Sequence, residues 1–150
     1  MKLSEALIIR SDLQKRVEQI RIRLVANAKV QEGDNTVENP IEILSELNQT
    51  LNELCEIMTR INLTNSKITD GNKSMTELLA ERDVLSMKIK IAQEFLTAAR
   101  NKIDRYSNKE IKIFSSVDVK SEQGKLDNLS KELRELDVKI QSLNWQFDLI

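Results

Sequence analysis

The chain has 150 residues, which is enough for one ordinary domain with its own hydrophobic core. Its 23 basic and 24 acidic residues nearly cancel, so no overall positive charge favours nucleic acid or an anionic membrane surface. It contains no histidine, which excludes His-dependent catalytic triads and the usual His-containing zinc and di-iron sites. We therefore expect no metal, no cofactor, no nucleic-acid partner and no membrane partner.

The composition indicates an all-α protein of the cytoplasm. Glycine and proline are scarce and aromatic residues make up only 3%, as in long helices that pack through aliphatic side chains. A single cysteine, Cys55, excludes an intrachain disulfide and fits a reducing compartment. No apolar run approaches the ~20 residues that cross a bilayer, and residues 5–10 lack the pattern of a signal peptide.

The first two predicted helices cover about residues 3–30 and 40–66. Apolar side chains recur at intervals of three and four in both segments, which places them on one helical face. Gly33 is expected to end the first helix. Asn39 and Pro40 predict the start of the second, because Asn39 can cap a helix and proline suits its first position.

Two further helices are predicted over about residues 75–104 and 121–147. Ser74 and Glu77 have the spacing of a capping box at the start of the third helix. The fourth has an unbroken heptad of apolar residues from Leu126 to Phe147. Because short turns join the segments, we expect an antiparallel bundle of four long amphipathic helices that forms one domain over residues 1–150.

A β-like segment is predicted over residues 110–119, between the third and fourth helices. Ile111, Ile113, Val117 and Val119 alternate there with polar residues, which is a strand pattern. A lone strand needs hydrogen-bond partners. The alternatives are a small hairpin that turns at Ser115-Ser116, pairing with the same strand of a second subunit, or a solvated arm.

Charge is unevenly divided between the first two helices. Residues 2–30 carry seven basic and three acidic side chains, whereas residues 32–66 carry one basic and seven acidic side chains. Adjacent helices of opposite charge favour each other. We therefore expect the basic face of the first helix to be neutralised by protein rather than by DNA.

Polar residues at positions of the apolar seams are the candidate functional residues, and Asn27 and Arg10 are two of these exceptions. Folding the first hairpin near residues 32–39 and the second near Asp70 brings three polar segments toward one end of the bundle. Buried arginines there would need carboxylate or carbonyl partners. The predicted polar layer consists of Arg10, Asp12, Asn62, Asn65, Arg82 and Asp83.

Several strings of the sequence resemble a family of small bacterial helical proteins often labelled septicolysin. The resemblance spans nearly the whole chain and implies a cytoplasmic helical protein of this length, with no catalytic residues to carry over. A secreted pore-former does not fit, because no apolar membrane-inserting hairpin is present. The strings are residues 13–16, 25–34, 60–65, 79–85, 117–119 and 143–145.

Two functions are compatible with these patterns. The first is a structural or interaction protein that forms a homo-oligomeric helical bundle, with a dimer or a dimer-based assembly expected because two-fold symmetry is the commonest. In that interpretation the 110–119 segment contributes to the contact between subunits, and the polar layer fixes helix register. The alternative is a small-ligand or phosphate-ester binding protein or enzyme that uses the polar layer.

Overall fold

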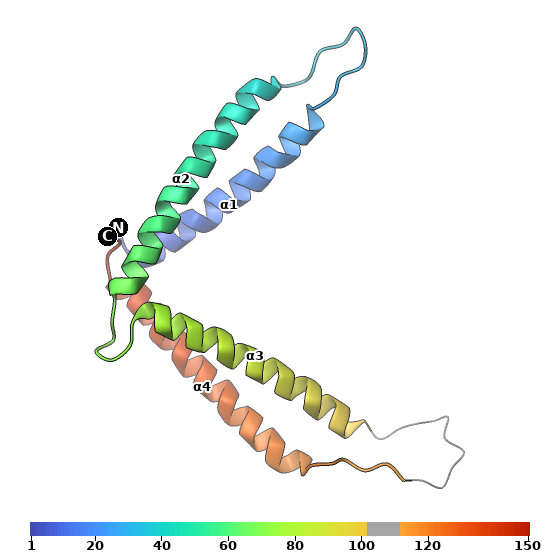
Figure 1. Cartoon of the computed structure of the whole chain (residues 1–150), viewed down its shortest axis with the longest axis vertical. Coiled ribbons are helices and arrows are strands. Elements are labelled where there is room, and N and C mark those ends of the chain that lie inside the picture. The colour runs from blue at the N-terminus through green and yellow to red at the C-terminus, as the bar shows by residue number, and fades with distance from the viewer. Residues whose placement is uncertain (102–111) are drawn as a thin grey trace. The chain divides into compact units, whose positions relative to one another are not determined.

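The computed structural model describes residues 1–101 and 112–150, and within them the protein is all-α (Figure 1). Four long helices follow one another along the chain, as the sequence predicts. No strand forms within the described residues; they contain only two isolated β-bridges, one joining Lys2 to Asp148 and the other joining Thr69 to Ser74. The helices are α1 (Leu3–Ala26), α2 (Pro40–Lys67), α3 (Met75–Arg100) and α4 (Val119–Gln146).

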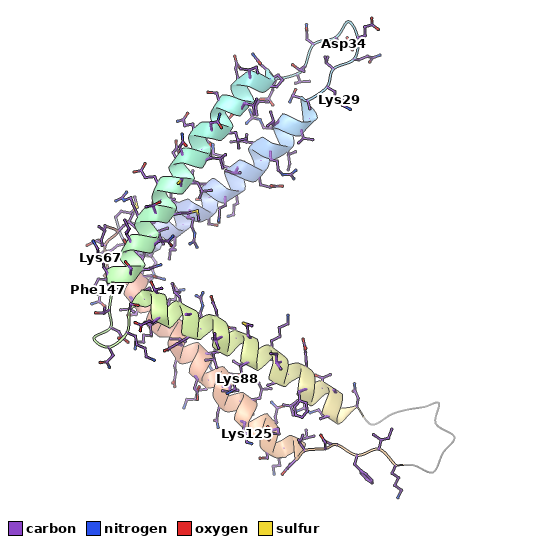
Figure 2. The ribbon with its side chains drawn as sticks, viewed as in Figure 1. Lys29, Asp34, Lys67, Lys88, Lys125 and Phe147 are labelled. Carbon is purple, nitrogen blue, oxygen red and sulfur yellow. The ribbon has the colours of Figure 1, made fainter. Side chains whose placement is uncertain are left out.

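The chain divides into two compact units, each built on an antiparallel helical hairpin. The first unit comprises residues 1–74 and 143–150, and α1 lies beside α2 in it. The second comprises residues 75–142, and α3 lies beside the main part of α4. Side chains cover both hairpins along their length, and the labels Lys29 and Asp34 in Figure 2 mark the connection between α1 and α2. A single domain over residues 1–150 stays a prediction.

Two helix starts are where the sequence places them. Pro40 is the first residue of α2, and the side-chain oxygen of Asn39 accepts a hydrogen bond from the backbone N–H of Ile41 at 3.0 Å. That bond satisfies one of the N–H groups that a helix leaves free at its first turn. Met75 begins α3 directly after Ser74. Both predicted starts are confirmed.

The Asn39 cap yields a first prediction. Asn39→Ala removes the acceptor for the Ile41 N–H, and we expect it to lower the free energy of unfolding by about 1 kcal/mol. Urea denaturation followed by circular dichroism measures this loss. The control is Asn48→Ala at an exposed position inside α2, where alanine is the better helix former and stability should be unchanged or slightly higher.

The first helix ends at Ala26, four residues before the predicted end. The reason is Asn27, which is only 7% exposed. Its side-chain amide donates to the backbone carbonyl of Arg23 at 2.8 Å, and its oxygen accepts from the backbone N–H of Glu38 at 3.0 Å. The amide thus closes the last turn of α1 and holds the segment that leads to α2, so Gly33 is not what ends the helix.

The predicted 110–119 strand is wrong where the structure describes it. Residues 112–118 are irregular, with a bend at Ser116 and Val117, and Val119 already belongs to α4. The Asp118 carboxylate accepts from the backbone N–H groups of Lys120 at 3.1 Å and Ser121 at 3.3 Å, which starts α4 two residues earlier than predicted. Residues 110 and 111 lie outside the described residues, as do residues 102–104 at the predicted end of the third helix.

Each unit has its own aliphatic core. In the first, Leu3, Ile20, Ile43 and Ile61 are at most 1% exposed. In the second, Ile89 and Leu96 of α3 pack with Leu126 of α4, and five partly buried apolar side chains surround them. Among the residues that the structure describes, no helix is both long and apolar enough to cross a membrane. The partly buried residues are Leu85, Ala92, Val119, Leu129 and Leu133.

Candidate functional site

The predicted polar layer falls into two separate groups. Arg10 and Asp12 lie on α1 and Asn62 and Asn65 on α2, all in the first unit, whereas Arg82 and Asp83 lie on α3 in the second unit. Each set lies within its own unit, and the layer as a whole stays a prediction.

In the first unit, Arg10 is the residue of the layer with an unmet hydrogen-bond need. It is partly buried, and its Nε is buried without a hydrogen-bond partner. Asp12 is exposed and lies 3.7 Å from the ammonium group of Lys15, a surface ion pair on the same helix. Asn62 is exposed and Asn65 is partly buried. Arg10 alone in this group thus offers a buried donor to an anion.

In the second unit, Arg82 pairs with its own neighbour in the chain. Its Nη2 lies 3.2 Å from the Asp83 carboxylate, and the two side chains are 34% and 70% exposed. Exposed ion pairs contribute about 0–1 kcal/mol. Arg82 is therefore only partly buried, with a carboxylate partner of the kind expected, and its place in a polar layer stays a prediction.

A charged network joins α1 to α2 at the other end of their hairpin. The Arg23 guanidinium donates to both oxygens of Glu38, at 2.7 and 3.2 Å, and to Glu46 at 3.1 Å. Arg16 adds a second contact to Glu46 at 3.5 Å. The expected neutralisation of the basic first helix by the acidic second one is thus present within the chain. Hydrogen bonds from Arg23 hold the pKa of the Glu38 carboxyl below its ordinary value.

The lowered pKa of Glu38 predicts a loss of stability in acid. A carboxyl of this kind contributes stability that is complete above its ordinary pKa of 4.5 and is lost as the pH falls through its lowered value. We expect Glu38→Gln to flatten the fall in melting temperature between about pH 5 and pH 2. Thermal unfolding at several pH values measures this. Glu32→Gln, at an exposed position in the same connection, should leave the acid slope as in the natural sequence.

The two ends of the described chain are tied together within the first unit. Leu149 donates its backbone N–H to the Met1 carbonyl at 2.9 Å, and the Lys2 ammonium lies 3.0 Å from the Asp148 carboxylate. Ile150 donates its N–H to the Thr64 hydroxyl at 3.0 Å, and Arg60 donates to the Ile150 carbonyl at 2.9 Å. Ile150 is therefore bonded to α2, whereas Phe147 and Leu149 bond to the first residues of the chain.

The second unit presents an exposed apolar face on α3, which we call the outer stripe. Its large members are Val84, Met87, Ile91 and Phe95, which are 65%, 63%, 63% and 46% exposed. Spacings of three and four residues place them on one face of the helix. The stripe is completed by Ala80 and Ala98, which are also exposed. Contiguous exposed apolar faces are common at sites where proteins bind partners or ligands.

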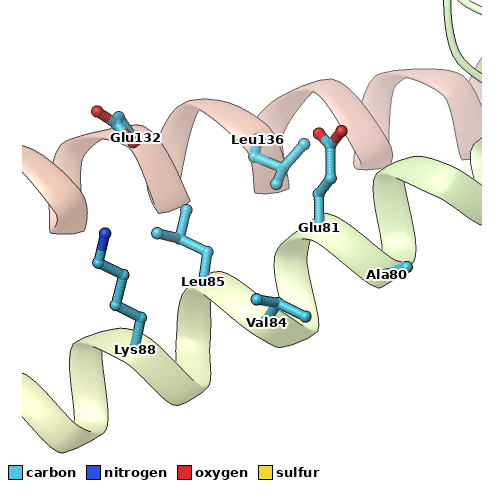
Figure 3. A pocket seen from close by; sticks show the side chains of 7 residues that line it. All are labelled: Ala80, Glu81, Val84, Leu85, Lys88, Glu132 and Leu136. Carbon is cyan, nitrogen blue, oxygen red and sulfur yellow. The ribbon is translucent and has the colours of Figure 1, made fainter.

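A groove between α3 and α4 begins at the outer stripe. It has a volume of about 580 Å³, and the stripe residues Ala80 and Val84 belong to its lining together with Leu85 and Leu136. In Figure 3, Lys88 extends from α3 toward α4 near Glu132, and Glu81 extends from α3 toward α4 near Leu136. The groove thus has an apolar floor between charged side chains.

Sequence reasoning missed the outer stripe because it assigned each helix a single apolar face. The apolar repeat that predicts the third helix lies on its inner face, which includes Leu78, Ile89 and Leu96. The signal for the second face is in the sequence: Val84, Met87, Ile91 and Phe95 repeat at helical spacing beside the first set.

Comparisons with known proteins agree with the helical fold. No protein of curated function matches the chain. A crystal structure from Corynebacterium diphtheriae, described as a functionally unknown conserved protein, shares 39% of its residues with this chain. The match covers 100% of this chain and 99% of that one, with a TM-score of 0.92. A model for a family of unknown function matches residues 10–149, and the chain therefore belongs to that family, DUF6847.

Proposed function

We propose that this is a structural or interaction protein that associates with further copies of itself through its helical faces. The observation that carries the proposal is the outer stripe of α3, whose four large apolar side chains remain 46–65% exposed on a unit only two helices thick. Burying apolar surface of this kind is the main driving force for protein association. A second copy of the chain carries the same outer stripe, and it is always present at the concentration of the protein itself.

The first unit adds support from a different helix. Leu44, Leu51 and Met58 of α2 are each 40% exposed and are spaced seven residues apart, which is the repeat of a helix–helix seam. The inner face of α2 is already occupied by Ile43, Ile57 and other residues that are buried in the first unit. Both units thus present an apolar face in addition to the one that they bury.

Light scattering coupled to size-exclusion chromatography tests the proposal. We expect more than one chain per particle at micromolar concentration, with a dimer as the first expectation because closed two-fold symmetry is the commonest. A monomer at that concentration overturns the proposal. The proposal rests on helical faces, and a contribution of the 110–119 segment to the contact stays a prediction, since residues 112–118 are irregular in the single chain.

A second candidate function is the binding of a small phosphate ester at Arg10. The observation that favours it is the buried Arg10 Nε without a hydrogen-bond partner, since guanidinium groups bind phosphate oxygens well. A thermal-shift screen of nucleotides and phosphorylated metabolites tests it. A rise in melting temperature that Arg10→Gln abolishes supports this function, and no shift with any compound rejects it.

We also place the protein in the cytoplasm. The supporting observation is Cys55, which is free and exposed on α2 and suits a compartment that keeps thiols reduced.

A further inference from the structure

We infer that the outer stripe of α3 packs antiparallel against the outer stripe of a second copy, around a two-fold axis at the level of residue 89. The inference rests on the proposed self-association and names the surface and orientation that produce it. It depends on three features of the second unit: the order of residues along the stripe, the adjoining groove and the two apolar faces of α3.

The stripe reads almost the same in both directions. Around residue 89, Ala80 is as far from the axis as Ala98, and Met87 is as far as Ile91. Val84 lies five residues before residue 89 and Phe95 lies six residues after it, so the two are opposite each other to within one residue. An isologous contact requires a surface that is complementary to itself, so that each residue meets its counterpart twice. In the antiparallel pair, alanine meets alanine at both ends and large side chains meet large ones inside.

The alanines at the ends also fit close helix packing. Small side chains at a contact let two helix backbones approach, so the distance between the helix axes is shorter there. The six positions from Ala80 to Ala98 extend over about 27 Å of helix at 1.5 Å per residue. This length is enough for a continuous seam along most of α3.

The groove next to the stripe adds apolar surface to it. A stable interface buries about 800 Å² on each partner, whereas exposed apolar patches on monomers reach only a few hundred. The groove of about 580 Å³ lies next to the stripe, with Leu85 and Leu136 in its lining. The side chains of the second α3 can therefore extend from the stripe into the groove.

The two faces of α3 correspond to the geometry of a four-helix bundle. In such a bundle each helix contacts two neighbours and needs two adjacent apolar faces. The inner face, with Ile89 and Leu96, packs on α4 of the same chain. The outer stripe then packs on α3 of the second copy.

Ile91→Asp tests the surface, because Ile91 lies inside the stripe and is 63% exposed, so its replacement does not open the core of the unit. We expect the full chain with Ile91→Asp to elute as a monomer with unchanged helical circular dichroism. Ile22→Asp is the matched control on α1, where the isoleucine is 57% exposed, and it should leave the assembly intact. An assembly unchanged by Ile91→Asp overturns the inference while the proposed function stands. A monomer in the natural sequence overturns both.

Cross-linking tests the orientation without relying on a variant that breaks the assembly. Ala80→Cys and Ala98→Cys are each made in a Cys55→Ser background, so that each chain has one thiol. After the two variants are mixed and allowed to exchange, a short thiol cross-linker should join Ala80→Cys chains to Ala98→Cys chains. Neither variant alone should cross-link, because like positions lie at opposite ends of an antiparallel seam. Cross-linking of either variant with itself, or none in the mixture, overturns the antiparallel pairing.

Discussion

Ile61→Ala should lower the free energy of unfolding by about 2–5 kcal/mol, because it removes three carbon atoms from a side chain that is only 1% exposed in the core of the first unit. The deleted atoms lose their transfer free energy, and the cavity that remains adds to the cost when the surrounding side chains cannot collapse into it. Chemical denaturation followed by circular dichroism measures the loss.

The matched control is the same substitution at Ile22, which lies on α1 of the same unit and is 57% exposed. Both changes replace a β-branched residue inside a helix by alanine, so both gain the same small helix propensity. Ile22→Ala should therefore change stability by less than about 1 kcal/mol. Equal effects at the two positions would contradict the core that the structure assigns to the first unit.

Sequence reasoning succeeded where a local signal fixes the structure. The start of α2 follows from Asn39 and Pro40, whose cap and backbone preference act within one turn. The pairing of α1 with α2 followed from their opposite charges and from the short connection between them. Both inferences require only residues that are close in the sequence or lie along one helical face.

The same reasoning failed where the outcome depends on a long-range contact. In the sequence, Asn27 is a polar exception in an apolar seam. In the structure, its side-chain amide forms hydrogen bonds both to Arg23 on α1 and to Glu38 in the connection. Sequence periodicity does not reveal that partnership, so the end of α1 was placed four residues too late. The 110–119 segment shows the converse: its alternation suggested a strand, yet a strand needs a partner that residues 112–118 do not have in the described chain.

The polar layer stays a prediction, because its residues come from two compact units: Arg10 and Asn62 lie in the first and Arg82 lies in the second. The exposed apolar faces are more informative than the layer. The face of a helix on which a residue lies follows from sequence spacing alone. The exposure of that residue depends on how many helices surround it, and each unit here has two helices.

Thr64 is completely buried, and its hydroxyl joins two parts of the first unit. It donates to the Arg60 carbonyl at 2.7 Å and accepts from the Ile150 N–H at 3.0 Å. Valine has nearly the same shape but has no oxygen, so Thr64→Val leaves the Ile150 N–H without its acceptor. Ile150 is 52% exposed, so water can replace part of this bond, and the loss is about 0.5–1.5 kcal/mol, the net contribution of a typical hydrogen bond. We expect a loss of stability in that range.

Hydrogen exchange locates the loss, because residues 147–150 should open before the helices do, and the amides of Leu149 and Ile150 should exchange faster in Thr64→Val. Thr59→Val is the control: the Thr59 hydroxyl also bonds back to a carbonyl one turn earlier, that of Cys55 at 2.8 Å, but it is exposed on α2. Both variants lose the hydrogen bond from the hydroxyl to the carbonyl one turn earlier. Only Thr64→Val also loses the acceptor for the Ile150 N–H. If Thr59→Val destabilises the protein as much as Thr64→Val does, or if the two amides stay protected, Thr64 is not what fixes this segment to α2.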